Sequence, residues 1–225
     1  MRLFLVRETT DLKEDSTDNI ERAGQFLANY FHTNPSNINS LINNPLASTL
    51  MKGFTNSTLG KFANPEQLEQ AAKLKARIWN APNENARACA KLIEGISRNH
   101  ISSIREDVLL AERMTGHMKD PDSHKICSDL NNDYGLFRAK YPHGESLFDV
   151  SCRLRLFFNT LRLDRDDENI NDVIIIADAH ILNLISMMWL GKTPEWFLDE
   201  PEEAPASIRL IEDTEDRGYV SKPPE

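Results

Sequence analysis

The chain has 225 residues, of which 40% are hydrophobic and 27% are charged, and its 35 acidic and 26 basic residues give a formal net charge of −9. This length and composition are typical of one globular domain and exclude a largely disordered chain. Nucleic acids and anionic membranes attract proteins through a positive field, so the acidic balance disfavours both as partners. We expect neither here.

The apolar segments of the chain indicate neither a secretion signal nor a membrane span. The apolar run at residues 1–6 is too short for the core of a signal peptide. The longer run at residues 173–191 contains Asp178, and a central Asp disfavours membrane insertion by about 2.5–3.5 kcal/mol. The three cysteines are widely spaced and odd in number, which favours a reducing compartment over a disulfide framework. We therefore predict a cytoplasmic protein.

Hydrophobic periodicity and turn residues predict alternating strands and helices. The first and fourth predicted strands are continuous apolar runs, which is the pattern of strands that helices cover on both faces. A long loop rich in Asn, Ser and Thr is expected at 32–65, and a polar, irregular segment at 116–144. In chain order we expect a strand at 2–6, a helix at 19–31, a helix at 67–76, a strand at 77–79, a helix at 86–96, a strand at 100–104, a helix at 146–163, a strand at 173–177, a helix at 181–190 and a strand at 207–212.

This alternation predicts an α/β fold, a three-layer sandwich with a mostly parallel central sheet. Residues 1–212 are expected to form a single domain in which 116–144 is a lid-like insertion. Residues 213–225 are expected to form a polar C-terminal tail that frays. Pockets of such sheets lie beyond the carboxyl ends of the central strands, which directs attention to residues 7–8 and 178–180.

Five segments of the chain carry a resemblance to a known family. They are MRLFLVR at 1–7, NAPNENARACAKLI at 80–93, EDVLLAERMTG at 106–116, FRAKYPHGESLFDVSCRLRLFF at 137–158 and VIIIADAHILNLISMMWLG at 173–191. By their order and spacing, the chain resembles the histidine phosphatase superfamily, the phosphoglycerate mutase-like fold, over nearly its whole length. The resemblance implies a site that uses a nucleophilic His, two Arg, a second His and a carboxylic acid.

Carried over position by position, the resemblance implies that most of this catalytic set is substituted. Arg7 matches the first Arg, which would grip phosphate oxygens, and Glu112 matches the acid, which would protonate the leaving oxygen. Glu8 stands where the family has its nucleophilic His, Asn85 where it has the second Arg, and Asp178 where it has the second His. Both histidines and one arginine are therefore missing.

These substitutions change the sign of the expected pocket. One Arg faces three carboxylates, a formal −2 where the family has +1, and each close carboxylate would repel a phosphate by about 1 kcal/mol or more. We therefore predict a catalytically inactive pseudophosphatase with a binding or scaffolding role. No cofactor is expected, and the partner is an unidentified small molecule or protein. Homodimerisation, which is common in the family, stays open.

Two enzymatic alternatives also stay open. A residual phosphomonoesterase would need a substitute for the missing histidine, for which His180 is the candidate; Arg87, two residues past Asn85, lies on another helix face. A carboxylate- or metal-dependent hydrolase would use Glu8, Glu112 and Asp178 as oxygen ligands for a hard cation.

A purely structural interpretation competes with the metal site. An Asp directly before a helix is a favoured N-cap, so Asp178 has a role that requires no ligand. Gly144 and Ser146 are likewise expected to form a turn and an N-cap that open the helix at Leu147. If the three acids do converge without a cation, like-charge repulsion raises the pKa of at least one of them.

Overall fold

Six strands form the centre of the molecule, in the order β3-β2-β4-β1-β5-β6. The computed structural model describes residues 2–8, 20–27, 75–97, 100–116, 121–166, 170–200, 207–214 and 218–222. Strands β1 to β4 run parallel, β5 runs antiparallel to β1, and β6 runs antiparallel to β5. The bounds are β1 Arg2–Arg7, β2 Lys75–Asn80, β3 Ile101–Glu106, β4 Ile170–Ala177, β5 Ile208–Thr214 and β6 Gly218–Lys222. The predicted mostly parallel sheet is confirmed.

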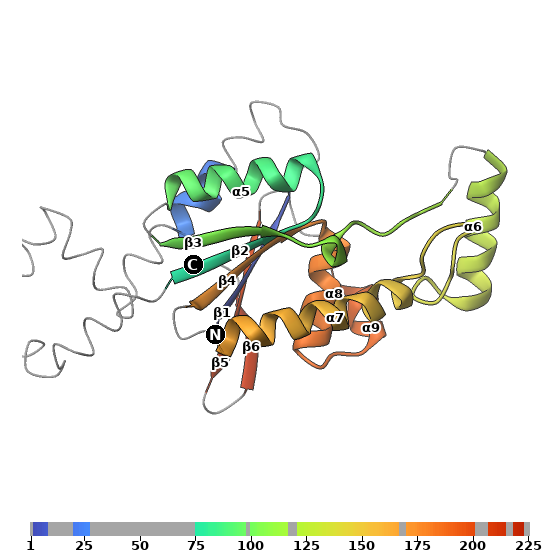
Figure 1. Ribbon diagram of the computed structural model, residues 1–225. Coiled ribbons are helices and arrows are strands. Elements are labelled where there is room, and N and C mark those ends of the chain that lie inside the picture. Colours follow the sequence, from blue (N-terminus) through green and yellow to red (C-terminus); the bar gives the residue numbers. More distant parts are fainter. Residues whose placement is uncertain are drawn as a thin grey trace, which may run out of the picture.

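Helices cover both faces of this sheet, as Figure 1 shows. One face carries α5 (Glu84–Ile96) and the helical residues 20–27, and Gly24 of that helix lies against Ile96 of α5. The opposite face carries α7 (Leu147–Asp166) and α8 (Ala179–Trp189). The three-layer sandwich is therefore also confirmed. No helix in the described part of the chain is long and apolar enough to cross a membrane.

The two continuous apolar runs form the two central strands of the sheet, β1 and β4. β1 and β4 pair in register from Arg2 opposite Asp172 to Arg7 opposite Ala177, and residues 3–6 and 173–177 are fully buried. Arg2 closes the start of this pair by donating from Nε to Asp172 Oδ1 at 2.6 Å and from Nη2 to Oδ2 at 2.9 Å. This ion pair fixes the amino ends of the two central strands relative to each other.

A buried charged group attaches α7 to the sheet. Asp164, near the end of α7, accepts hydrogen bonds from Arg77 Nη1 and, at 2.6 Å, from Trp79 Nε1, both on β2. The Trp79 ring packs edge-on against Phe157 of the same helix, with centroids 5.8 Å apart. Because Asp164 is 2% exposed, its charge depends on these two partners for compensation.

Two of the expectations about secondary structure are wrong. The segment at 116–144 is not simply irregular, because it contains the helix α6 (Pro121–Tyr134), which projects away from the sheet in Figure 1. The fraying expected for residues 213–225 is wrong for those that the structure describes, because β5 continues to Thr214 and residues 218–222 return as β6. Backbone pairing with β5 orders this polar strand.

Two further elements follow the polar loops, and some predictions fall outside the described residues. The 3-10 helix η3 (Val108–Leu110) and the short helix α9 (Pro194–Asp199) were not expected from periodicity. The loop predicted at 32–65 and the helix predicted at 67–76 lie outside the described residues, except for residues 75 and 76, which belong to β2.

Candidate functional site

The carboxyl ends of β1, β2 and β4 meet at one edge of the sheet, and each is followed by a polar side chain. Glu8 follows β1, Asn83 follows β2 as the N-cap of α5, and Asp178 follows β4 as the N-cap of α8. The amide of Glu8 donates to the carbonyl of Ala177 at 3.1 Å, which extends the β1–β4 pairing by one residue. Glu8 and Asp178 therefore follow the same register position on neighbouring strands.

Glu8 is held in a partly buried environment with an uneven set of partners. Its Oε1 accepts a hydrogen bond from Asn83 Nδ2 at 3.0 Å, whereas its Oε2 is buried and has no hydrogen-bond partner among the described residues. Burial raises the pKa of Glu8 from its ordinary 4.5 to about 6, and the charges of Asp178 and Glu112 add to the rise, against the opposing effects of Asn83 and Arg7. At least one acid with a raised pKa was expected, although burial rather than repulsion is the main cause.

Asp178 acts as the helix cap that its place in the sequence indicates. Its Oδ1 accepts from the amide of His180 at 2.8 Å, and His180 Nδ1 lies 3.4 Å from the same oxygen. Burial raises the pKa of Asp178, but the hydrogen bonds and charge of His180 outweigh it and hold the pKa below its ordinary value. Asp178 is therefore an ionised neighbour of Glu8.

His180 lies beside Asp178 and also lines a cavity to which Glu8 does not contribute. It is exposed on the first turn of α8, and its ring lies 6.4 Å from that of Phe197 on α9. Together these two residues line a small cavity of about 140 Å³ to which Glu8 does not contribute. The role of His180 as a substitute for the missing histidine stays a prediction.

Glu112 reaches this site through a braced loop after η3. Its side chain is exposed, and its charge acts on Glu8 across the site. The loop is held by Arg153 of α7, which donates to the carbonyl of Ala111 at 2.6 Å and to that of Leu109. Arg153 also pairs with Glu145, Nε to Oε1 at 3.0 Å. The arginine thus fixes the backbone that carries Glu112.

The segment from Gly144 to Ser146 has the structural role predicted for it. Ser146 caps α7, since its Oγ accepts from the amide of Asp149 at 3.0 Å and Asp149 Oδ2 accepts from the amide of Ser146 at 3.0 Å. A Cβ atom at Gly144 would lie 2.6 Å from the carbonyl oxygen of Met114, so only glycine fits this close approach. These contacts join the start of α7 to the Glu112 loop.

The amide that contacts Glu8 comes from Asn83 and not from Asn85, which sequence reasoning singled out. Asn83 bridges two elements, because its Oδ1 accepts from the amide of Ala86 at 2.8 Å while its Nδ2 reaches Glu8. Asn85 is half-buried in the first turn of α5. Arg87 lies on the exposed side of that helix and pairs with Glu106 at 2.6 Å, in agreement with its expected displacement from the site.

The three carboxylates do not form a ready cation site. In the parts of the chain that the structure describes, no group of three or more His, Cys, Asp or Glu side chains is arranged to hold a metal ion. Glu8 nevertheless interacts electrostatically with the other three residues of the predicted site. The charges of Asp178 and Glu112 raise its pKa, and the charge of Arg7 lowers it. The arrangement can accept hydrogen bonds and cations, and it disfavours a phosphate dianion.

The fold is a three-layer α/β sandwich, and its candidate site lies at the carboxyl ends of the central parallel strands. The model of the histidine phosphatase superfamily (branch 1) matches residues 60–223, so the chain belongs to that superfamily. The match begins after β1 and does not include residues 7 and 8. The correspondence of Arg7 and Glu8 with the family's Arg and His therefore stays a prediction.

Two plant proteins and several solved structures resemble the chain. It is 25% identical over 134 residues to the phosphoglycerate mutase-like protein AT74H of Arabidopsis thaliana, covering 56% of this chain and 46% of that protein. Phosphoglycerate mutase-like protein AT74 of the same plant is 21% identical over 143 residues, 60% of this chain and 45% of that protein. The chain thus spans about half the length of the curated relatives it matches.

The structural similarity extends over the whole fold at low sequence identity. The α-ribazole phosphatase from Shigella flexneri has a TM-score of 0.64 at 13% identity, covering 100% of this chain and 96% of that one. Mycobacterial glucosyl-3-phosphoglycerate phosphatase Rv2419c has a TM-score of 0.58 at 16% identity, covering 99% and 96%. These likenesses establish the fold.

Proposed function

We propose that this protein is a catalytically inactive member of its superfamily, a pseudophosphatase that binds a small molecule or a protein partner at the Glu8 site. The observation that carries the proposal is Glu8 itself, a partly buried carboxylate at the end of β1 beside the ionised Asp178. The resemblance expects the nucleophilic histidine at this position.

Charge is the first argument against phosphoryl transfer. A phosphomonoester would bring about two negative charges to a site where Arg7 stands against Glu8, Glu112 and Asp178. A phosphohistidine intermediate requires an imidazole nitrogen, which neither Glu8 nor Asp178 offers. Attack by a carboxylate instead would bring like charges together without the second arginine that the family uses to neutralise them.

The chemistry of the site favours a ligand that donates hydrogen bonds. Glu8 Oε2 is a buried acceptor without a hydrogen-bond partner among the described residues, and a buried unpaired acceptor is costly. A hydroxyl, amide or ammonium group of a ligand would satisfy it. Such a ligand differs in charge from the phosphate esters named for the structural neighbours.

The proposal is tested by assaying the purified chain for turnover of p-nitrophenyl phosphate, alone and with Mg²⁺, Mn²⁺ or Zn²⁺. We expect no turnover above the protein-free blank in any condition. Turnover that Glu112→Gln abolishes would instead establish the alternative, a residual phosphomonoesterase or a carboxylate- or metal-dependent hydrolase that uses the same pocket.

A restored variant provides the matched positive experiment. Glu8→His, Asn85→Arg and Asp178→His combined should allow the chain to take up one phosphoryl group from the same ester, detected as added mass by intact-protein mass spectrometry. A restored variant that folds with wild-type circular dichroism but gains no phosphoryl group counts against the proposed correspondence of these three positions.

A further inference from the structure

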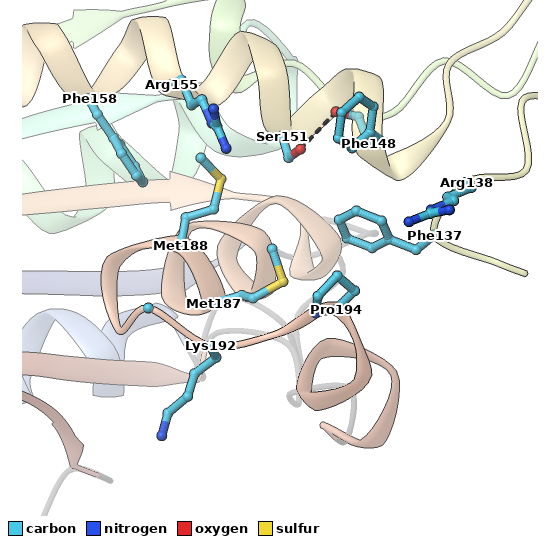
Figure 2. Close-up of a pocket in the computed structure, with 11 residues that line it drawn as sticks. Phe137, Arg138, Phe148, Ser151, Arg155, Phe158, Met187, Met188, Lys192 and Pro194 are labelled. Carbon is cyan, nitrogen blue, oxygen red and sulfur yellow. Dashed lines mark hydrogen bonds between the residues drawn. The ribbon is translucent and has the colours of Figure 1, made fainter.

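A second cavity, of about 510 Å³, opens between the start of α7, the end of α8 and the start of α9 (Figure 2). It adjoins Met187, Met188 and Gly191, at the opposite end of α8 from Asp178. Since α8 has 11 residues, the two ends lie about 16 Å apart. The cavity is therefore separate from the Glu8 site, and a ligand bound in it would be independent of the proposed function.

Large apolar side chains form most of the wall of this cavity. Phe137 and Phe148 lie at one side in Figure 2 and Phe158 at the other, with Met187 and Met188 between them. Two of the rings are fixed by edge-on contacts, Phe137 against Phe197 at 6.1 Å and Phe158 against Trp189 at 5.5 Å. Phe148 remains 53% exposed, which leaves an aromatic surface without a protein partner at the rim.

The charged groups at this cavity are cations. Its lining includes Arg138, Arg155 and Lys192 and contains no carboxylate, in a chain whose formal net charge is −9. Figure 2 shows the Arg155 guanidinium directed toward Met188 and the Arg138 guanidinium beside Phe137, whereas Lys192 points away. This composition is the reverse of the acidic Glu8 site.

Arg155 is the cation of this cavity that is least engaged by other groups of the described chain. Among the described residues it forms no ion pair or side-chain hydrogen bond. Arg138 is partly engaged, since Glu195 has a pKa lowered by Thr193, by backbone hydrogen bonding and, more weakly, by Arg138. At the end of α8, the carbonyls of Met187 and Met188 already accept from the amides of Lys192 at 2.8 Å and Gly191 at 3.4 Å.

We infer that this cavity binds an organic acid with a large apolar body, an aromatic or acyl chain whose single carboxylate or sulfonate lies against Arg155. Its volume is in the range of small-molecule sites, whose walls are mostly apolar with a few polar groups that orient the ligand. The aromatic rings and methionines would bury the body, and the guanidinium fork would bind the acid group in two places.

The test uses the naphthalene dye 1-anilinonaphthalene-8-sulfonate and its uncharged analogue N-phenyl-1-naphthylamine, titrated by fluorescence into the full-length protein. We expect saturable 1:1 binding of the sulfonate, about tenfold tighter than binding of the neutral analogue. Arg155→Gln should weaken the sulfonate about tenfold and leave the neutral analogue unchanged. Phe148→Ala should weaken both dyes.

Arg162→Gln is the matched control, because Arg162 is exposed on the same helix and does not line the cavity. It should change neither titration. Displacement of the sulfonate by laurate or by 2-naphthoate supports the inference and separates acyl from aromatic acids; displacement by neither overturns it.

Three other results overturn the inference. They are equal binding of the charged and neutral dyes, equal weakening by Arg155→Gln and Arg162→Gln, and a dimer in sedimentation velocity that Arg155→Gln dissociates. If Arg155→Gln alters the circular dichroism spectrum, Arg155→Lys replaces it. The Lys variant keeps the charge but loses the fork, so it should bind the sulfonate with intermediate strength.

Discussion

At the scale of single residues, Glu8 binds its proton more tightly in the folded chain than in the unfolded one. Its pKa is raised from 4.5 to about 6, so the free energy of unfolding that it contributes is full below pH 4.5 and is lost as the pH rises through 6. The shift corresponds to about 2 kcal/mol, and solvent screening of the exposed part of the carboxyl reduces this to the order of 1 kcal/mol.

The variant Glu8→Gln should therefore gain stability relative to the wild type as the pH rises. We expect the difference in unfolding free energy between the two proteins to grow by the order of 1 kcal/mol from pH 4.5 to 6.5, measured by urea denaturation. Taking the difference cancels the other titrating groups. A difference that stays constant over this range would show that Glu8 is not perturbed by folding.

Asp178 stabilises α8 as a cap, so its removal should cost stability without any ligand. Asp178→Ala should lower the free energy of unfolding by about 1 kcal/mol, measured by urea denaturation at pH 5, where Glu8 is mostly protonated and repels little. Asp178→Asn is the control, because Asn also caps helices well and should cost much less. Equal losses in the two variants would contradict the capping role.

The sequence predicted the two acids of this site but not the amide that contacts one of them. The cap at Asp178 and the acid at Glu8 follow from their places beside apolar strands. The contact of Asn83 with Glu8 does not, because it depends on how α5 packs over the sheet. The signal that existed was an Asn after a Pro and directly before a helix, which indicates an N-cap but not what its free amide touches.

At the scale of elements, Arg153 binds three segments together. It joins α7 to the η3 loop and to the Glu145 turn through a guanidinium whose side chain is 17% exposed. Removing it leaves the carbonyls of Leu109 and Ala111 without this donor and leaves the Glu145 carboxylate with only the amide of Met114, at 3.1 Å.

Arg153→Met should therefore lower the free energy of unfolding by about 2 kcal/mol and loosen the loop. Hydrogen exchange should accelerate at the amide of Glu145, which donates to Met114 O at 2.7 Å, while the amides of β1 stay protected. Arg162→Met, exposed on the same helix, should change neither quantity. Unchanged exchange at Glu145 would show that the loop holds itself in place.

The elements that sequence analysis missed share a physical reason. α6 has a polar sequence and buries little beyond Cys127, in a small cluster with Ala139 and Tyr141 that is separate from the main core. β6 depends on backbone pairing with β5 rather than on an apolar run. Hydrophobic periodicity detects elements that pack on the main core, and the buried cluster of α6 is separate from that core.

At the scale of the whole molecule, the buried carboxylate of Asp164 is a charge whose removal the fold should tolerate poorly. Asp164→Ala should lower the free energy of unfolding by about 3–5 kcal/mol, because it leaves Arg77 buried without its compensating charge and Trp79 without its acceptor. The control is Arg87→Ala, which breaks the exposed pair with Glu106 and should have little effect. Urea denaturation measures both variants, and similar losses would contradict this assignment.

The distribution of charge, rather than its total, distinguishes the Glu8 site from the cavity at the far end of α8. Carboxylates gather at the carboxyl ends of the central strands, and arginines gather at the far end of α8. The net charge of −9 in the sequence indicates only the first. The second requires knowledge of which helix faces meet, since residues 138, 155 and 192 are distant in the chain.

If the chain is inactive as proposed, the pairing of β1 with β4 has a consequence for which substitutions would give it phosphoryl transfer. The register holds residues 8 and 178 beside each other, and the charge of Asp178 adds to the rise in the pKa of Glu8 that burial causes. Glu8→His alone would set an imidazole next to a carboxylate, which stabilises the imidazolium and occupies the lone pair needed for attack. Asp178→His alone would leave no nucleophile at residue 8. Neither single substitution is expected to supply a reactive nucleophile. Under the proposed function, phosphoryl transfer therefore requires both substitutions together.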